Sequence, residues 1–572
     1  MEKGCTALGC LVLLVVGMFV LRGWWSEPAP PEPSRTLATL DPSRSPSEPS
    51  GRTPELVSSP SGPTSPASDD PFSARPESDA DPFAPSSPVR PLELPGPDRL
   101  NQALPERLVR LQAAARASNT AYDWRQLADA AVQAEHFALA SQAYRQEADI
   151  YRRTGDPHAA RAEELKSARY ATEIELYVEQ RAPEGQASAR LEPTSGCYLG
   201  AFIDRDDNLP SVVLQSQRHG DIPRFNQLTG KNHSSFFMYR SYGQPFPFQW
   251  AERVKASGAI PQIAWEPRSL DQVQDDAYLQ SFVAEVARLD WPVFIRFAGE
   301  MNGEWTPYHG DPPAYRRAFR TVYQAFRKAP RAALIWCPNS VPVTGLEEYY
   351  PGDDAVDWVG VNLYSVLFLD NDPARPGEAV NPIDLLDPVY RKFSARKPIA
   401  IGEYAASHQS ALSPATRSDF AVDKMRQLYE SLPTRYPRVK LVSWYDCNNL
   451  VHARPGRQLN NYLVTEPREV LEAYRATIRQ PHFLAAGQQA SAVVAVRLES
   501  GHPVKAGQAV LIWARSYVSR PRVFLRVDGK LVSDRLRWKL TGLKPGRHKL
   551  EVLVYDDRGR LAGRLERAVK LE

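Results

Sequence analysis

The sequence predicts an α/β protein built around a (β/α)8 TIM barrel, with a small all-α helical segment before it and an immunoglobulin-like β-sandwich after it. The barrel prediction rests on residues 195–479, where eight short runs of β-branched and aromatic residues alternate with helix-length amphipathic segments. The sandwich prediction rests on residues 488–572, where apolar and polar residues alternate with period 2 between turn signals. An open doubly wound sheet is the main competitor, but no glycine-rich phosphate loop follows the first strand.

The composition is that of a multidomain globular protein with one proline-rich segment. The chain has 572 residues, which corresponds to about three to four domains. Apolar residues make up 42% of it and charged residues 24%, which excludes a wholly disordered chain. Its net charge of +3 gives no electrostatic basis for binding nucleic acid. Proline and serine are concentrated in residues 26–100, which we expect to form a disordered linker.

Residues 1–25 predict a membrane anchor or signal segment. Residues 5–21 carry no charge, and Arg22, Trp24 and Trp25 suit the membrane interface. A cleaved signal peptide is the alternative, although no small-residue cleavage site follows the apolar run. Either way the sequence predicts an exported protein, which is anchored in a membrane with its folded domains outside the cytoplasm, or secreted if the N-terminus is cleaved.

Residues 101–183 predict a stack of two or three helices. Apolar residues recur at helical spacing, and Gly155-Asp156-Pro157 interrupts them before a further helix over residues 159–177. We expect a structural spacer or, alternatively, a surface for envelope protein partners. The positions that resemble one tetratricopeptide repeat, without a second copy, are Trp124, Leu127, Ala140 and Tyr144.

The barrel elements can be assigned in order along the chain. The predicted strands are Tyr198–Ile203, Ser235–Ser241, Ile260–Trp265, Val293–Phe297, Ala333–Trp336, Trp358–Asn362, Ile399–Ile401 and Lys440–Trp444. The predicted intervening helices include Gln249–Ala256, Leu270–Leu289, Pro313–Lys328, Pro382–Ser394 and Ser413–Leu432.

Two glutamates lie where a barrel places its reactive groups, at the carboxyl ends of strands. Glu300 follows the fourth strand and Glu403 follows the seventh, so the two should face each other across the barrel mouth. Retaining glycoside hydrolysis requires such a pair, an acid for the leaving oxygen and a nucleophile about 5–5.5 Å away. No cofactor is predicted, and no His/Cys/Asp cluster has the spacing of a metal site.

Aromatic and polar residues near the strand ends are candidates for binding a polysaccharide substrate, because aromatic rings stack on the C–H faces of sugars. Arg296 is expected mainly to keep a carboxylate ionised, and Glu266 and Glu304 to be accessory or solvated. The candidate substrate-binding residues are Trp265, Arg296, Asn302, Trp305, Tyr308, Tyr364, Tyr404 and Trp444.

The string Arg296–Trp305 (RFAGEMNGEW), with Ile-Gly-Glu403-Tyr downstream and Ile263-Ala-Trp265-Glu-Pro upstream, resembles glycoside hydrolase family 26, which holds β-mannanases and related endo-β-glycanases. The resemblance implies that Glu300 is the acid/base and Glu403 the nucleophile. It also implies that Tyr364 hydrogen-bonds the nucleophile and that Trp444 lies at the cleavage subsite.

One position departs from the family pattern. Gly299 stands where the family has a histidine that helps to hold the sugar. This departure removes neither carboxylate. The resemblance as a whole implies a retaining endo-β-glycosidase that acts by double displacement on β-mannan or a related β-glycan. The alternatives are a catalytically inactive barrel that binds polysaccharide and a scaffold protein of an exopolysaccharide system.

Beyond the barrel, the sandwich strands and the cysteines complete the prediction. Asp528-Gly529 predicts a hairpin. Cys197, Cys337 and Cys447 are expected to be buried free thiols. The predicted sandwich strands are Ala492–Leu498, Ala509–Tyr517, Arg522–Val527, Leu531–Val532, Arg535–Leu540 and Lys549–Tyr555.

Overall fold

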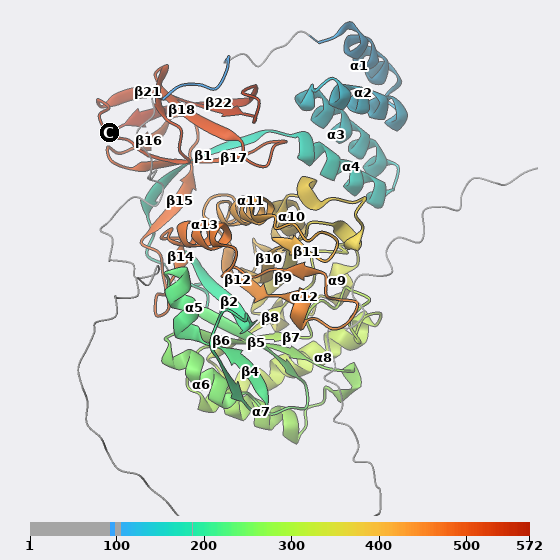
Figure 1. Cartoon of the computed structure of the whole chain (residues 1–572), viewed down its shortest axis with the longest axis vertical. Coiled ribbons are helices and arrows are strands. Elements are labelled where there is room, and N and C mark those ends of the chain that lie inside the picture. The colour runs from blue at the N-terminus through green and yellow to red at the C-terminus, as the bar shows by residue number, and fades with distance from the viewer. Residues whose placement is uncertain (1–91, 98–103, 186) are drawn as a thin grey trace, which may run out of the picture. The chain divides into compact units, whose positions relative to one another are not determined.

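A computed structural model of the chain describes residues 92–97, 104–185 and 187–572 (Figure 1). The predicted anchor segment and nearly all of the predicted linker lie outside these residues. Within the described ranges, no helix has the length and apolar character needed to cross a membrane.

In the described part of the chain, eight parallel strands close into the predicted barrel. They follow the order β2, β5, β6, β7, β8, β9, β10 and β12, and β12 pairs with β2 to complete the ring. All eight predicted strands are confirmed, and a short strand, β14 (Phe483–Leu484), adds to β2 from outside the ring. Their bounds are β2 Cys197–Arg205, β5 Ser235–Ser241, β6 Ile260–Glu266, β7 Val293–Phe297, β8 Ala332–Trp336, β9 Trp358–Ser365, β10 Ile399–Ala406 and β12 Val439–Cys447.

Helices follow the strands and cover the outside of the barrel (Figure 1). The helix α7 (Ala277–Arg288) shows why they form: Asp276 caps its first turn, and its apolar side chains, including Phe282, pack on the strands. Residues Leu270–Gln272 form a separate 3₁₀ turn, so the predicted helix over Leu270–Leu289 is too long. The other α-helices of residues 195–479 are α5 Ile222–Thr229, α6 Phe248–Ala256, α8 Pro312–Ala325, α9 Leu346–Tyr349, α10 Pro382–Phe393, α11 Ser418–Tyr429, α12 Asn449–His452 and α13 Arg468–Ile478.

The N-terminal helices form a small core of their own. Trp124, Leu127, Ala140 and Tyr144 are buried in it, as their helical spacing predicts. Within residues 104–185 the helices are α1 Glu106–Ser118, α2 Ala121–Gln133, α3 Phe137–Arg153 and α4 Pro157–Tyr170.

The prediction of a helix up to Tyr177 is wrong. The helix α4 ends at Tyr170, and the next residues form a strand, β1 (Glu173–Arg181). β1 pairs with two strands of the C-terminal domain, β15 (Val493–Arg497) and β17 (Ala509–Arg515), and Figure 1 shows it in turquoise beside the orange β17. The run EIELYV alternates polar and apolar residues, a strand signal that the neighbouring helix-forming residues obscured.

The C-terminal residues form a β-sandwich, as predicted. Among the described residues, a four-stranded sheet (β15-β1-β17-β20) and a five-stranded sheet (β16-β22-β21-β18-β19) share a hydrophobic core that includes Leu176, Ile512, Leu525 and Val552. The hairpin at Asp528-Gly529 connects β18 to β19. The remaining strands are β16 His502–Val504, β18 Arg522–Val527, β19 Lys530–Ser533, β20 Arg537–Lys539, β21 Gly546–Tyr555 and β22 Leu561–Leu571.

Candidate active site

Glu300 lies in a strained turn directly after β7. Ala298 and Glu300 have positive φ angles of 46° and 60° on either side of Gly299, a conformation that costs a residue with a Cβ about 1–2 kcal/mol. Backbone hydrogen bonds to the neighbouring strands hold the turn: the Ala298 N–H donates to Trp265 O (2.9 Å) and the Glu300 N–H to Cys337 O (2.8 Å). The turn directs Glu300 away from the direction in which β7 would have continued.

Neutral groups surround the Glu300 carboxyl. Asn339 and Asn362 donate from Nδ2 to its Oε1, at 3.0 and 2.9 Å, and Trp305 donates from Nε1 to its Oε2 at 2.7 Å. These bonds lower the pKa of Glu300, but burial and the nearby Glu403 raise it more, so the pKa lies above its ordinary value. Of the four lone-pair positions, one on Oε2 stays free for a proton.

The Glu403 carboxyl lies on β10 and receives the same number of donors, but one of them is a cation. Arg296 on β7 donates to Oε1 of Glu403 and forms an ion pair with it. Tyr239 on β5 also donates to Oε1, at 2.7 Å, and Tyr364 on β9 donates to Oε2. The pair is buried, with 1% of the Arg296 side chain and 3% of the Glu403 side chain exposed. The Glu403 carboxyl therefore has a cationic partner within the barrel, and removing that partner would leave a buried charge without compensation.

Asn362 and Arg296 connect the two carboxyl groups. Asn362 Oδ1 accepts from Arg296 Nη1 (3.3 Å), so its amide nitrogen is turned toward Glu300. Asn362 and Glu403 are also partners in the register of β9 and β10. Gly402 permits this close approach, because a Cβ there would lie 2.8 Å from Arg296 Nη1 and 2.7 Å from Asn362 Oδ1.

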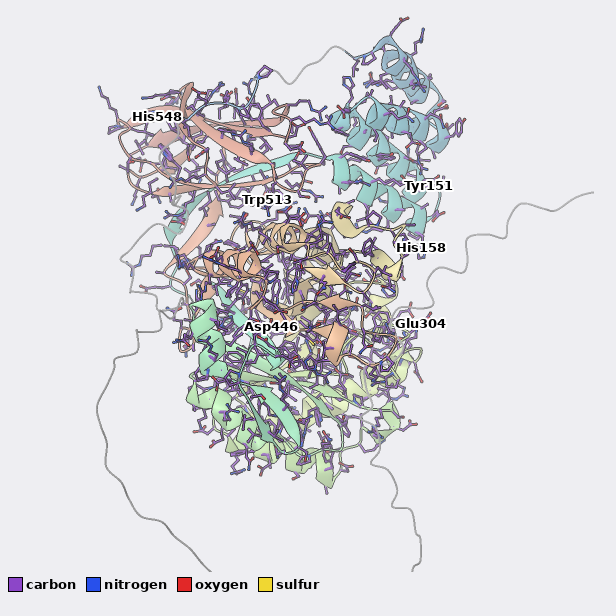
Figure 2. All side chains as sticks on the ribbon, in the orientation of Figure 1. Tyr151, His158, Glu304, Asp446, Trp513 and His548 are labelled. Atoms are coloured by element: carbon purple, nitrogen blue, oxygen red, sulfur yellow. The ribbon has the colours of Figure 1, made fainter. Side chains whose placement is uncertain are left out.

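A third carboxyl group, Glu266, ends β6 beside this pair. Only 5% of the residue is exposed, and burial raises its pKa to about 8. The Tyr308 hydroxyl contacts Oε2 of Glu266 and lies 2.6 Å from the carbonyl oxygen of Gly299. The prediction that Glu266 is accessory or solvated is therefore wrong as to solvation, whereas Glu304 is exposed, at the edge of the barrel in Figure 2.

Three of the predicted sugar-binding aromatic residues point away from the barrel mouth. Trp265, Tyr404 and Trp444 have no exposed surface. Trp265 stacks on Phe282 of α7 (4.0 Å between ring centroids), and Trp444 packs with Tyr404, Tyr429 and Tyr474 against the outer helices. Successive residues of a strand point to opposite faces, so Glu266, Glu403 and Tyr445 take the inward positions. The prediction that these three rings stack on sugar is wrong.

Two further predicted substrate-binding residues are buried and form their hydrogen bonds with other protein groups. Asn302 is 2% exposed, and its Nδ2 donates to Asn339 O and Pro342 O while its Oδ1 accepts from the Asn339 N–H. Tyr308 is 2% exposed and contacts Glu266. These two residues therefore hold neighbouring parts of the site in place through hydrogen bonds within the protein. Among the predicted set, Trp305 and Tyr364 are half-buried, and their polar atoms reach Glu300 and Glu403.

Residues that were not predicted complete the site. Tyr239, Asn339 and Asn362 supply half of the hydrogen bonds that the two carboxyl groups receive. Tyr239 and Asn362 lie in the carboxyl-terminal halves of β5 and β9, and Asn339 lies just beyond β8. Tyr239 and Asn362 occupy inward positions in the alternation of their strands, which is the signal that could have found them. Cys197, Cys337 and Cys447 are buried free thiols, as predicted. Among the described residues, no group of His, Cys, Asp or Glu side chains is placed to bind a metal ion.

Two arginines lie on the loop after β12 near the site. Arg454 and Arg457 are half-buried, and neither guanidinium has an ion pair or hydrogen bond within the residues that the structure describes. Burial and the charge of Arg454 lower the pKa of Arg457 to about 10, while Glu300 acts in the opposite direction. The loop is tied to the segment after β10 by the Ala411 N–H, which donates to Leu459 O (2.9 Å). It therefore brings uncompensated positive charge within electrostatic range of Glu300.

Residues 266–374 match the sequence profile of glycosyl hydrolase family 26. The barrel is a family 26 domain. The matched segment begins at Glu266 and contains Glu300, Asn362 and Tyr364, whereas Glu403 lies beyond it. The family predicted from the string RFAGEMNGEW is thus confirmed.

The family 26 domain is similar in sequence to two curated enzymes. A β-1,3-xylanase of Alcaligenes sp is 30% identical over 120 residues, which are 20% of this chain and 23% of that enzyme. A β-1,3-xylanase of Vibrio sp is 29% identical over 108 residues, which are 18% of this chain and 23% of that enzyme. The match thus spans less than a quarter of the length of these relatives.

Solved structures in the same family were also found by structural comparison. A modular endo-β-1,4-mannanase from Cellulomonas fimi superposes with a TM-score of 0.38 at 15% identity, covering 66% of this chain and 94% of that one. A β-mannanase from Bacteroides ovatus gives a TM-score of 0.37 at 15% identity, covering 52% and 92%.

Proposed function

We propose that the family 26 domain is a retaining endo-β-glycosidase that cleaves a β-linked polysaccharide by double displacement. The observation that supports this most directly is the contrast between its two central carboxyl groups. Glu300 has a raised pKa among neutral donors, while Glu403 is paired with Arg296. One group is thus suited to donate a proton and the other to carry a negative charge, as retaining hydrolysis requires.

The proposed reaction uses the free position on each Oε2. Glu300 transfers its proton to the glycosidic oxygen while Glu403 Oε2 attacks the anomeric carbon, so the glycosidic bond breaks and a glycosyl ester forms. Glu300, now ionised, takes a proton from water, and the resulting nucleophile cleaves the ester. Arg296 and Tyr239 bind Oε1 of Glu403 throughout, whereas Oε2 receives only the Tyr364 hydroxyl.

The substrate class follows from the family, from the similar enzymes and from the arginine loop. β-1,3-Xylan is the first candidate because both curated relatives are named for that activity. β-Mannan is the second, because the RFAGEMNGEW string resembles a family that holds β-mannanases. The unpartnered Arg454 and Arg457 favour a third candidate, a β-glycan that carries carboxylate groups, because an anionic sugar would supply the partner that the half-buried guanidinium groups lack.

The test is a substrate panel followed by chemical rescue. Residues 92–572 are incubated with β-1,3-xylan, β-mannan, β-glucan and a uronate-containing β-glycan, and the products are sized. In Glu403→Ala we expect turnover to fall by about 10⁴-fold or more, because the nucleophile is lost. Azide should then restore turnover of an activated aryl glycoside and give the glycosyl azide of inverted configuration.

The matched control is Glu304→Ala, which removes an exposed carboxyl from the same turn as Glu300 and should leave turnover unchanged. Full activity in Glu403→Ala would refute the assignment. Binding of a polymer without any product would instead indicate a non-catalytic polysaccharide-binding barrel.

We also propose that the domain acts outside the cytoplasm, tethered by the N-terminal apolar segment. This rests on the uncharged residues 5–21 and on the proline- and serine-rich sequence that follows them. Fractionation of cells that express the full chain tests it: the protein should be found with the membrane and be degraded by protease added to spheroplasts.

A further inference from the structure

Glu266 occupies a position that the double-displacement mechanism does not use. It ends β6, next to the turn that carries Glu300, and it is buried with 5% of its surface exposed. A buried carboxyl without a cationic partner of its own is costly unless it holds a proton. The Arg296 guanidinium acts on Glu266 electrostatically, but its ion pair is with Glu403.

The contacts of Tyr308 determine where the proton lies. Its hydroxyl has one hydrogen and touches two oxygens, Oε2 of Glu266 and the Gly299 carbonyl oxygen at 2.6 Å. A carbonyl oxygen accepts only, so Tyr308 must donate to Gly299. The contact with Oε2 is then a hydrogen bond only if Glu266 itself donates, which requires the protonated carboxyl.

The other oxygen of Glu266 remains available. Oε1 has no hydrogen-bond partner among the described residues and is not fully covered by protein. Gly299 contributes no side chain here, and a Cβ at this residue would lie 3.5 Å from Oε1. A side chain at residue 299 would therefore lie against Oε1, and glycine leaves this side of Oε1 uncovered.

We propose that Glu266 is a neutral carboxylic acid that donates through Tyr308 to fix the Gly299 carbonyl, and that its Oε1 accepts a hydrogen bond from a sugar hydroxyl beside Glu300. Glu266 is thus a positioning residue for the acid turn and a specificity residue for the substrate. The ligand of Oε1 would be a glycan whose sugar ring carries a free hydroxyl next to Glu300. The second half of the proposal rests on the proposed glycosidase function.

The charge balance around Glu266 explains why the proton matters. Ionised Glu266 would leave Tyr308 with two acceptors for one hydrogen, and it would add a negative charge beside Glu300 and Glu403. The Gly299 carbonyl, and with it the strained turn, would lose its hydrogen bond. The titratable and charged groups that face Glu266 are Arg296, Glu300, Tyr308, Tyr315, Cys337 and Glu403.

The first test measures stability and needs no substrate. The pKa of Glu266 is raised from 4.5 to about 8 in the folded protein, so the folded state binds the proton more tightly than the unfolded state. This contribution to stability is complete below pH 4.5 and is lost as the pH rises to 8. The substitution Glu266→Gln places an amide at this position, which would keep both contacts without a titrating proton.

We therefore expect the melting temperature of Glu266→Gln, minus that of the wild type, to grow by several degrees between pH 4.5 and 8 and then to level off. Glu304→Gln is the matched control and should show no such trend. A difference that stays flat over this range, or shrinks, would overturn the protonated state. Glu266→Ala should lose stability at pH 5, where the wild-type acid keeps both hydrogen bonds.

The second test measures sugar recognition with 2,4-dinitrophenyl β-mannobioside and 2,4-dinitrophenyl β-xylobioside, whose leaving group needs no acid. We expect kcat/KM to fall about tenfold or more in Glu266→Ala, mainly through KM, and Glu266→Gln to recover most of that loss. In the wild type, kcat/KM should also decline above pH 8, and this decline should be absent in Glu266→Gln.

The outcomes separate this inference from the proposed function. If neither glycoside nor any polysaccharide is cleaved, the glycosidase proposal fails, and the melting experiment still decides the protonation of Glu266. If the wild type is active but Glu266→Ala has an unchanged KM, the sugar contact of Oε1 is refuted while the glycosidase proposal stands. Equal losses in Glu266→Ala and Glu266→Gln would likewise refute a hydrogen-bonding role.

Discussion

Glu300 and Glu403 have the same side chain and the same number of hydrogen-bond donors, yet their surroundings prepare them for opposite tasks. Each receives two donors on Oε1 and one on Oε2. The donors to Glu300 are two amides and an indole, all neutral, whereas those to Glu403 are two phenols and the Arg296 guanidinium. The charge of a single donor thus distinguishes the two sites, and it is the basis on which we propose Glu300 as the proton donor and Glu403 as the nucleophile.

One side chain, Arg296, is connected to both carboxyl groups. Arg296 pairs with Glu403 and, through Asn362 Oδ1, orients the amide that binds Glu300. A side chain on β7 therefore forms the ion pair of one carboxyl group and orients a hydrogen-bond donor to the other. Changes at these residues should affect the two carboxyl groups unequally, which gives direct tests of the contrast.

The largest effect is expected at Glu300 itself. Glu300→Gln keeps the size of the side chain but cannot give a proton, so kcat/KM for polysaccharide should fall by about 10³-fold. For a 2,4-dinitrophenyl glycoside, whose leaving group needs no proton, the loss in kcat/KM should be less than tenfold. Initial rates on both substrates measure it, and equal losses on both would contradict the assignment of Glu300 as the acid.

The next effect is expected at Arg296. Arg296→Gln leaves the Glu403 carboxyl buried without its cation, which should cost about 3–5 kcal/mol of folding stability. Denaturant unfolding of the variant and of the wild type measures the difference. Unchanged stability would show that the buried ion pair does not stabilise the fold.

The smallest effect is expected at Trp305. Its indole N–H favours the ionised form of Glu300, so Trp305→Phe should raise the pKa of Glu300 further. The basic limb of the pH profile of kcat/KM should therefore shift to higher pH. A basic limb that stays in place would mean that the Trp305 hydrogen bond does not act on the pKa of Glu300.

The barrel strands could be predicted from local sequence because each one is a short apolar run bounded by turn residues. Ser235–Ser241 and Val293–Phe297 match their predicted bounds, and the two carboxylates were found because barrels expose the ends of their strands. The β1 strand was missed since its pairing partners lie more than 300 residues away in the chain, as Tyr177 opposite Arg497 illustrates. Nonlocal pairing of this kind leaves no mark in the local pattern.

The sequence by itself determined the barrel, the family and the position of Glu300 and Glu403 at the ends of two strands, because strand periodicity and a short motif are local properties of the chain. Only the tertiary structure decided which neighbours contact each carboxyl group. Trp265, Tyr404 and Trp444 pack outward, while Tyr239 and Asn362 donate to Glu403 and Glu300, and Glu266 is buried beside them. The protonation states follow from burial and from the charge of donors on other strands, and those are set only when distant segments meet.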